Sequence, residues 1–211
     1  MKKDKAVNTL RRLGIMGGTF DPVHNGHLVA AEAVRQEFNL DKVVFIPAGR
    51  PPHKNADLIT NPEHRYIMTA LATASNEYFE VSRIEVEKTE ISYTVDTIKD
   101  LRTKYGEAVD IFFITGADSV LELLTWHKAE ELLKLCSFIA VTRPGFDKGE
   151  LEQKVYEIKS KYNGEIISIE VPLLEISSTD IRERVREGKS IKYLLPSDVE
   201  KYIEKNGLYK E

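Results

Sequence analysis

The chain has 211 residues, enough for one large domain or two small ones with a sizeable core. Its hydrophobic content of 42% and charged content of 30% are ordinary for a soluble globular protein. With 30 Lys and Arg against 34 Asp and Glu, the net charge of −4 excludes recruitment of nucleic acid by an overall basic field, so an anionic ligand would need a local site.

The N-terminal stretch MKKDKAVNTLRRLGIMGG is basic, but its apolar part is too short for a signal peptide or a membrane span. No later segment has the ~18 uninterrupted apolar residues of a transmembrane helix. We therefore expect a soluble, cytoplasmic protein without a membrane partner. The single cysteine, Cys136, excludes an internal disulfide. It lies in the apolar stretch LLKLCSFIAV, which favours a core residue over a nucleophile.

Short runs of β-forming residues alternate with longer segments of helical periodicity. Most of the runs are continuously apolar, as expected for parallel strands covered by helices on both faces. The predicted strands cover 13–16, 42–47, 79–87, 110–115, 137–142 and 165–171. The predicted helices cover 26–38, 62–75, 94–105, the region 118–135, 149–162, and two segments beginning at Ser178 and near Pro196.

This alternation predicts an α/β fold, a Rossmann-like doubly wound parallel sheet with a small C-terminal helical appendix. The strand over 79–87 alternates more regularly than the others, which favours a sheet edge. No repeat, low-complexity tract or linker marks a second domain, so residues 1–211 are expected to form one domain whose helical part covers about 177–211. Ligands are expected at the carboxyl ends of the strands.

The first candidate site is GGTFDPVHNGHL, residues 17–28, between the first strand and the first helix. Its double glycine would let a ligand approach the backbone, and Gly26 would clear more space. Asn25 is expected to cap the helix. His27 would lie in the first helical turn, beside unpaired N–H groups and the positive end of the helix dipole. The pattern predicts an anion site into which His24 and His27 project.

Other interpretations of this stretch are weaker. It lacks the GxGxxG pattern of a dinucleotide-binding turn. A metal site would need a third ligand, and no Cys, HExxH or Asp-rich motif accompanies the two histidines. Histidines that serve only as core or capping residues are the usual explanation of a lone HxxH, but the double glycine before them favours a ligand.

The second candidate site is EISSTDIRERVREG, residues 175–188. Ser177, Ser178 and Thr179 supply helix caps and hydroxyl donors. Arg182 lies four residues after Ser178, so the two side chains share one helix face and can converge on a polyphosphate. The alternative is an ordinary capped surface helix.

Several shorter motifs lie between these two. PAGRPPHK would present His53 and Lys54 from a stiff loop, or would be a rigid surface turn with solvated charges. ISYTVDT opens a helix, and TGADS places Asp118 just after a strand. TWH carries the single tryptophan, Trp126, which would by itself be taken as a half-buried packing residue.

GGTFDPVHNGH resembles the HxGH signature of the nucleotidyltransferase superfamily, and ISSTDIR resembles the late signature of its adenylyltransferase branch. With PPHK, SYTVDT, GAD and TWH, the chain resembles the bacterial nicotinate-nucleotide adenylyltransferases over roughly residues 13 to 209. The resemblance implies transfer of the adenylyl group of ATP to nicotinate mononucleotide, giving nicotinate adenine dinucleotide and pyrophosphate in NAD biosynthesis. It also implies direct in-line attack without a covalent enzyme intermediate, and Mg²⁺ held by the substrate phosphates rather than by a protein metal site.

Roles for individual residues follow from the same resemblance. The catalytic residues would be His24, His27, Lys54 and Arg182. The ATP and phosphate contacts would come from Gly17, Gly18, Thr19, Phe20, Gly26, Ser177, Ser178 and Thr179. The nicotinate nucleotide would be bound by His53, Thr94, Asp118, Trp126 and His127.

Some alternatives stay open. Phosphopantetheine adenylyltransferases share both signatures but lack the PPHK and TWH elements, and ISSTDIR argues against a cytidylyltransferase. A non-catalytic nucleotide sensor could keep the fold. Preference for the nicotinate acid over the nicotinamide form depends on backbone donors, which the sequence does not reveal. The oligomeric state is open, a homo-oligomer included, and no nucleic-acid partner is expected.

Overall fold

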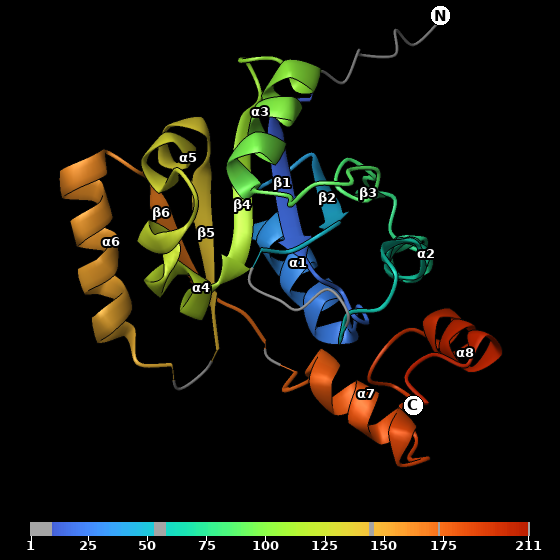
Figure 1. The fold of residues 1–211 in the computed structure, drawn as a ribbon. Helices are drawn as coiled ribbons and strands as arrows, with labels where there is room; N and C mark the ends of the chain where they lie inside the picture. Colours follow the sequence, from blue (N-terminus) through green and yellow to red (C-terminus); the bar gives the residue numbers. More distant parts are fainter. Residues whose placement is uncertain (1–9, 53–57, 144–145, 173, 211) are drawn as a thin grey trace, which may run out of the picture.

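A parallel sheet with the strand order β3-β2-β1-β4-β5-β6 forms the centre of the protein in the computed structural model (Figure 1). The structure describes residues 10–52, 58–143, 146–172 and 174–210. The strands are β1 (Arg12–Gly18), β2 (Lys42–Pro47), β3 (Phe79–Val81), β4 (Asp110–Gly116), β5 (Ser137–Thr142) and β6 (Ile166–Glu170). Every neighbouring pair is parallel, and β1 lies between β2 and β4. The predicted doubly wound α/β fold is confirmed.

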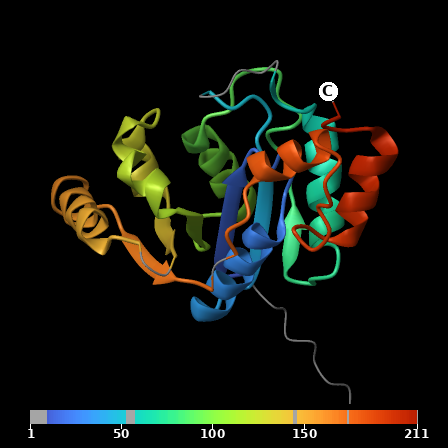
Figure 2. The same ribbon diagram turned by 90° about the horizontal axis from the view of Figure 1, so that it is seen from below.

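Helices cover both faces of this sheet, as Figure 2 shows for α1 and α3 on opposite sides of the central strands. One face carries α3 (Thr94–Tyr105), α4 (Ala117–Leu121), the 3₁₀ helix η2 (Leu123–Thr125), α5 (Ala129–Leu135) and α6 (Lys148–Tyr162). The other face carries α1 (Asn25–Glu37), α2 (Pro62–Thr73), α7 (Ser178–Arg186) and α8 (Ser197–Asn206). Among the described helices, none combines the length and apolar character needed to cross a bilayer.

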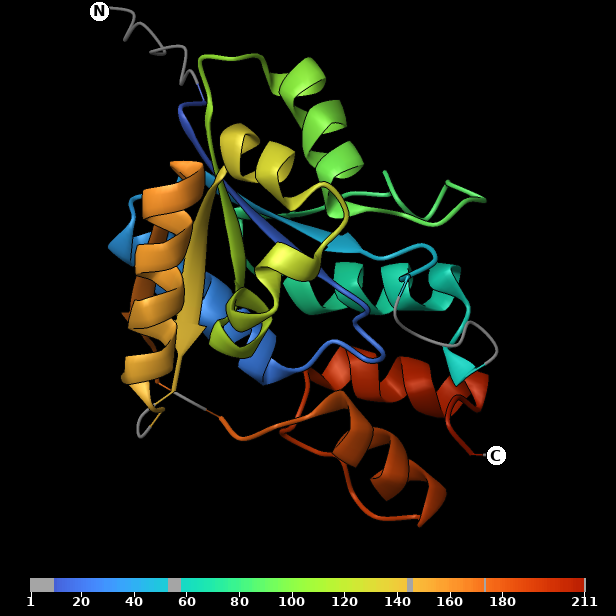
Figure 3. The same cartoon turned by 60° about the vertical axis from the view of Figure 1, so that its left-hand side comes forward.

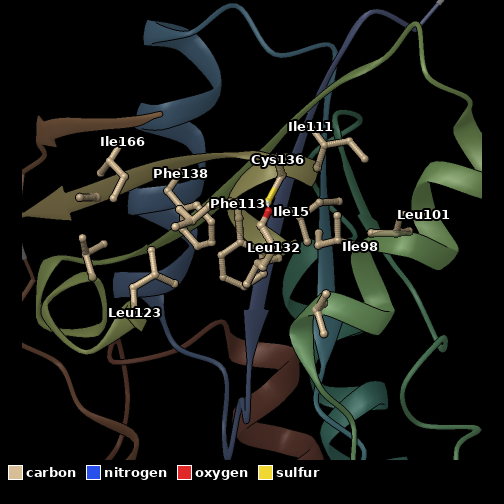
Figure 4. Close-up of a cluster of buried hydrophobic side chains, with 14 of the residues drawn as sticks. Ile15, Ile98, Leu101, Ile111, Phe113, Leu123, Leu132, Cys136, Phe138 and Ile166 are labelled. Carbon is tan, nitrogen blue, oxygen red and sulfur yellow. Dashed lines mark hydrogen bonds between the residues drawn. The ribbon is translucent and has the colours of Figure 1, made fainter. Parts of the chain in front are cut away.

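The core between the sheet and α3 to α6 contains the cysteine (Figure 4). Cys136 is 6% exposed, and its Sγ donates a hydrogen bond to the carbonyl of Leu132 at 3.7 Å. Burial raises the pKa of the Cys136 thiol to about 12, so the thiol stays protonated and cannot act as a nucleophile at neutral pH. The prediction of a core cysteine is confirmed.

The two C-terminal helices share the core of the opposite face with the sheet. Ile181 of α7 and Val199 and Ile203 of α8 are buried together with Val34 of α1 and Met68 of α2. Figure 3 shows α7 and α8 lying below the carboxyl ends of the central strands. The appendix therefore packs against the end of the sheet at which ligands are expected.

Two predicted elements have different bounds in the structure. The strand predicted over 79–87 ends at Val81, because the next residues form a turn in which the Glu87 N–H donates to the Arg83 carbonyl; its predicted position at a sheet edge is confirmed. The helix predicted over 118–135 is divided into α4, η2 and α5, and Lys128 adopts a left-handed conformation (φ 52°) where the chain changes direction.

The N-cap of α1 also differs from the prediction. His24 is the N-cap, and Asn25 is the first helical residue. The Asn25 side chain instead donates from Nδ2 to the Tyr193 carbonyl at 2.7 Å, and its N–H donates to the Leu194 carbonyl at 2.9 Å. These two bonds join the start of α1 to the segment between α7 and α8.

Candidate active site

A cavity of about 350 Å³ opens at the carboxyl ends of β1, β4 and β5. β1 and β4 are neighbours in the sheet, but the helices that follow them, α1 and α4, lie on opposite faces. This reversal leaves a crevice between the two connections, the usual ligand site of doubly wound folds. The polar residues and glycines on its wall include Gly17, His24, Gly26, His27, Asp118 and Arg143. The expected position of the ligand site therefore coincides with a cavity that the two histidines line.

The turn between β1 and α1 fixes the tautomer of His27. The backbone N–H of His24 donates to Nδ1 of His27 at 3.2 Å. Because Nδ1 accepts this bond, the neutral ring must carry its hydrogen on Nε2. His27 therefore offers an N–H donor at the N-terminus of α1, where backbone N–H groups and the helix dipole also favour an anion.

His24 packs against His27, with 3.7 Å between the ring centroids. It is 7% exposed, and its Nδ1 is a buried polar atom without a hydrogen-bond partner in the described part of the chain. A Cβ on Gly26 would lie 3.0 Å from this nitrogen, so a side chain at position 26 would crowd the ring. Unpaired buried polar atoms are uncommon, and one on a cavity wall points to a ligand.

Phe20 also packs against the imidazole of His27. Its ring meets the His27 ring edge to face at a centroid distance of 5.1 Å, and it is 3% exposed. Phe20 has a φ of 49°, an uncommon conformation for a residue with a side chain. A Cβ on Gly18 would lie 2.9 Å from the Phe20 ring. The glycine at position 18 thus makes room for Phe20, whereas the sequence had suggested room for a ligand.

Both imidazoles are neutral at physiological pH in this structure. Burial lowers the pKa of His24 to about 4. Burial, with a smaller contribution from the neighbouring His24, lowers the pKa of His27 to about 3. The positive potential at the turn therefore comes from oriented N–H donors and nearby arginines and not from imidazolium ions.

These lowered pKa values make the stability of the protein sensitive to acid. The unfolded chain has ordinary histidines and binds more protons than the folded chain as pH falls below about 6.5, so the free energy of unfolding is highest above that pH. At pH 5 each histidine is expected to remove about 2 kcal/mol relative to pH 7.5. Urea unfolding at the two pH values measures this loss.

The matched control is the double variant His24→Gln/His27→Gln. It lacks the two titrating rings, so its loss of stability between pH 7.5 and pH 5 should be smaller than that of the wild type by about 4 kcal/mol. An equal loss in the two proteins would contradict neutral, buried histidines in the folded state.

The N-terminus of α7 lies directly against the β1–α1 turn. Ser178 Oγ donates to the Pro22 carbonyl at 2.8 Å, and the Arg182 guanidinium donates to the Asp21 carbonyl at 2.7 Å. The same guanidinium lies 3.3 Å from Thr179 Oγ1, and Ser177 caps the helix by accepting from the Asp180 N–H. The tertiary structure thus joins the two motifs that the sequence singled out at opposite ends of the chain.

The far wall of the cavity contains one predicted residue and one that sequence reasoning missed. Asp118 is exposed in α4, just after β4. Arg143 is exposed directly after β5 and brings a cation to the same cavity. The signal for Arg143 was present in the sequence, because TRPG follows an apolar strand in the same way that GAD follows β4.

Of the described residues predicted to bind a nicotinate nucleotide, Asp118 lines this cavity, whereas Thr94, Trp126 and His127 lie outside its lining. Thr94 is the first residue of α3. Trp126 is half-buried and packs edge to face against Phe113, with 6.0 Å between ring centroids. His127 stacks on Tyr93 at a centroid distance of 4.2 Å. His53 and Lys54 lie outside the described residues.

No group of three or more His, Cys, Asp or Glu side chains suited to a metal ion occurs within the described ranges. The donors on the described cavity wall include the imidazoles of His24 and His27 and the guanidinium group of Arg143, which suit an anion better than a cation. The arrangement can hold a polyphosphate at the turn and leave the adjacent cavity for the nucleoside.

Comparison with known proteins agrees with this chemistry. A family model described as cytidylyltransferase-like matches residues 15–184. A probable nicotinate-nucleotide adenylyltransferase of Thermoanaerobacter sp. (strain X514) is 58% identical over 95% of this chain and 95% of its own length. A protein of the same description from Moorella thermoacetica is 57% identical over 94% of this chain and 92% of its own.

Solved structures share the fold. The Plasmodium falciparum nicotinic acid mononucleotide adenylyltransferase, in complexes with APC and with NaAD, superimposes with TM-scores of 0.74 and 0.76 at 20% identity. Each comparison covers 94% of this chain and 97% of the other.

Proposed function

The chain belongs to the nicotinate-nucleotide adenylyltransferases, within the cytidylyltransferase-like family, and from this premise we propose that it transfers the adenylyl group of ATP to nicotinate mononucleotide. The products are nicotinate adenine dinucleotide and pyrophosphate, a step of NAD biosynthesis. The observation that carries the proposal is the pair of adjacent, neutral imidazoles at the N-terminus of α1, on the wall of a cavity and beside α7.

The reaction needs no nucleophile from the protein. A phosphate oxygen of nicotinate mononucleotide forms a bond to the α-phosphorus of ATP, and the bond from that phosphorus to the bridging oxygen of the β-phosphate breaks. The electron pair leaves with pyrophosphate. Such a transfer depends on alignment of the two phosphates and on donors that meet the developing charge.

The residues around the β1–α1 turn would supply these donors. His27 would donate from Nε2 to the transferring phosphate, and His24 would contact the neighbouring phosphates. Arg182, Ser178 and Thr179 would hold the departing pyrophosphate, since α7 starts at the turn. The remaining phosphate-side proposals are backbone or side-chain contacts from Gly17, Gly18, Thr19, Phe20, Gly26 and Ser177. Lys54 is proposed as a further phosphate ligand from its family motif alone.

For the nicotinate nucleotide, the proposed ligands are Thr94, Trp126, His127 and His53, as the family motifs imply. Thr94 at the start of α3 is consistent with binding of a carboxylate by backbone N–H groups. Asp118 lines the same cavity as the imidazoles, which supports a contact to a nucleotide ribose. Trp126 is half-buried, so the core does not enclose this residue completely.

Mg²⁺ is proposed to enter with the phosphates of ATP and to neutralise part of their charge. Among the described residues of the cavity wall, Asp118 carries the one carboxylate, which is consistent with an ion held mainly by substrate phosphates and water. A cytoplasmic location and a single domain spanning 1–211 stay predictions, and the oligomeric state stays open.

The test is pyrophosphate release from ATP and Mg²⁺ with nicotinate mononucleotide, nicotinamide mononucleotide or phosphopantetheine at equal concentrations. We expect kcat/KM for the nicotinate acceptor to exceed that for the nicotinamide acceptor at least about tenfold, because a hydrogen bond to a charged group contributes at least about 1.5 kcal/mol and about 1.4 kcal/mol is a factor of ten. Equal use of both pyridine nucleotides would contradict the acid specificity. No release with any acceptor would contradict the enzymatic function and favour a nucleotide sensor.

A further inference from the structure

Arg65, in α2, is fully buried, at 0% exposure. Its guanidinium donates from Nη1 to the Thr19 carbonyl at 2.7 Å, from Nε to the Thr60 carbonyl at 2.8 Å and from Nη2 to the Gly49 carbonyl at 3.1 Å. All three acceptors are main-chain carbonyls. A buried cation is costly unless it is well hydrogen-bonded, so its presence here indicates a specific structural task.

The three carbonyls lie in different segments beyond the carboxyl ends of the strands. Thr19 follows β1 in the turn between β1 and α1, here named the phosphate turn because it is proposed to bind the phosphates of ATP. Gly49 follows β2. Thr60 precedes α2. Gly49 and Thr60 also lie before and after the PPHK motif in the sequence. One side chain therefore joins the phosphate turn to the residues on both sides of the PPHK motif.

The carboxylates of Asp21 and Glu85 lie near this guanidinium and are hydrogen-bonded to residues of other segments. Burial lowers the pKa of Arg65, and the charges of Asp21 and Glu85 act in the opposite direction. Asp21 accepts a hydrogen bond from the Tyr209 hydroxyl at 2.7 Å, and Glu85 accepts one from Thr97 Oγ1 at 2.7 Å. The buried network thus extends from the phosphate turn to α3 and to the C-terminal residues.

The Thr19 bond has a direct consequence for His27. In a planar trans peptide, fixing the direction of the Thr19 carbonyl also fixes the orientation of the Phe20 N–H. Phe20 then adopts its left-handed φ of 49° and places its ring edge to face against His27, at 5.1 Å. A shift of the Thr19 carbonyl would therefore move the Phe20 ring, which packs against the His27 imidazole that is proposed to bind the transferring phosphate.

From these contacts we infer that Arg65 is a positioning residue of the proposed adenylyl transfer, acting through Thr19 and Phe20 on the imidazole of His27. The inference rests on the proposed function for its kinetic consequence. Lysine cannot replace this arginine, because a single ammonium nitrogen cannot reach three carbonyls that a planar fork of donors reaches together. Arg65 is fully buried and is not proposed to touch a substrate, so its effect should fall on alignment and not on binding.

Arg65→Lys is expected to lower kcat per folded molecule by about 10²-fold, because small misplacements of reacting groups have effects of that size. The KM values for ATP and nicotinate mononucleotide should change by less than about threefold, since the lost alignment matters chiefly in the transition state. Circular dichroism gives the folded fraction. Arg65→Gln is the second variant, because a neutral amide avoids a buried ammonium ion should Arg65→Lys fail to fold.

Arg102 provides the matched control. Its guanidinium also donates to main-chain carbonyls, those of Leu135 and Val109. These carbonyls lie at the amino ends of β5 and β4, away from the carboxyl ends at which the cavity opens. Arg102→Lys should lose stability while keeping kcat per folded molecule within about twofold of wild type. A kcat for Arg65→Lys and Arg65→Gln that matches the control would overturn the inference.

A second measurement does not depend on activity. The ¹H–¹⁵N spectrum of the histidine side chains reports the ring environment of His27, assigned with His27→Gln. We expect its resonances to shift in both Arg65 variants and to stay in place in Arg102→Lys. Unchanged His27 resonances in the Arg65 variants would overturn the inference. If the wild type failed to release pyrophosphate, the proposed function would fall, and this spectrum would still decide whether Arg65 positions the imidazole.

Discussion

Replacing His27 by alanine is expected to lower kcat for adenylyl transfer by about 10³-fold, with a fold that circular dichroism cannot distinguish from wild type. Loss of one donor to a developing oxyanion typically lowers the rate by about 10²- to 10³-fold. The upper end applies here because the ring is held from two sides, by the His24 N–H at 3.2 Å and by Phe20 at 5.1 Å. A donor fixed in this way needs little rearrangement in the transition state.

The control for this variant is His27→Gln. The amide keeps an uncharged N–H donor, and the wild-type ring is itself neutral because burial lowers the pKa of His27 to about 3. We therefore expect His27→Gln to recover at least about tenfold of the lost rate. Stopped-flow or discontinuous assays of pyrophosphate release measure both variants. A kcat for His27→Ala within about tenfold of wild type would remove His27 from the transition state.

Gly49→Ala is expected to lower the free energy of unfolding by about 3 kcal/mol. A Cβ at this position would lie 2.1 Å from the carbonyl oxygen of Glu85 and 2.9 Å from its carbonyl carbon. These are backbone atoms, so no rotation of a side chain relieves the overlap. The same residue also accepts the bond from Arg65, so any shift of the loop disturbs the buried cation. Urea unfolding gives the change in free energy.

Gly116→Ala serves as the matched substitution. Gly116 is the last residue of β4, at the same end of the sheet as Gly49, and has a φ of −66° that alanine adopts readily. Within the described part of the chain, a Cβ at this position would meet no atom of a more distant residue within 4 Å. Its stability should change by no more than about 0.5 kcal/mol, or rise slightly because the unfolded chain loses freedom. Equal destabilisation by the two substitutions would show that the close approach to Glu85 is not the reason for glycine at position 49.

The regular elements could be predicted from the sequence because their signals are local. Continuous apolar runs gave the bounds of β2 and β5 without error, and helical periodicity gave those of α3. The same signals placed GGTFDPVHNGHL at a strand–helix boundary, which led to the proposal of an anion site at the N-terminus of α1. They failed over 79–87, where alternating residues continue into a hydrogen-bonded turn, and over 118–135, where a left-handed residue interrupts the helix.

By itself, the sequence determined the fold class, the family resemblance and the two motifs that carry the proposed chemistry. Only the tertiary structure decided how the imidazoles are held neutral, how Arg182 reaches the Asp21 carbonyl, and how Arg65 joins the β1–α1 turn to the β2–α2 connection. The physical reason lies in the acceptors of these long-range bonds. They are main-chain carbonyls, which every residue type carries, so residue identity leaves no pattern from which the pairing could be predicted.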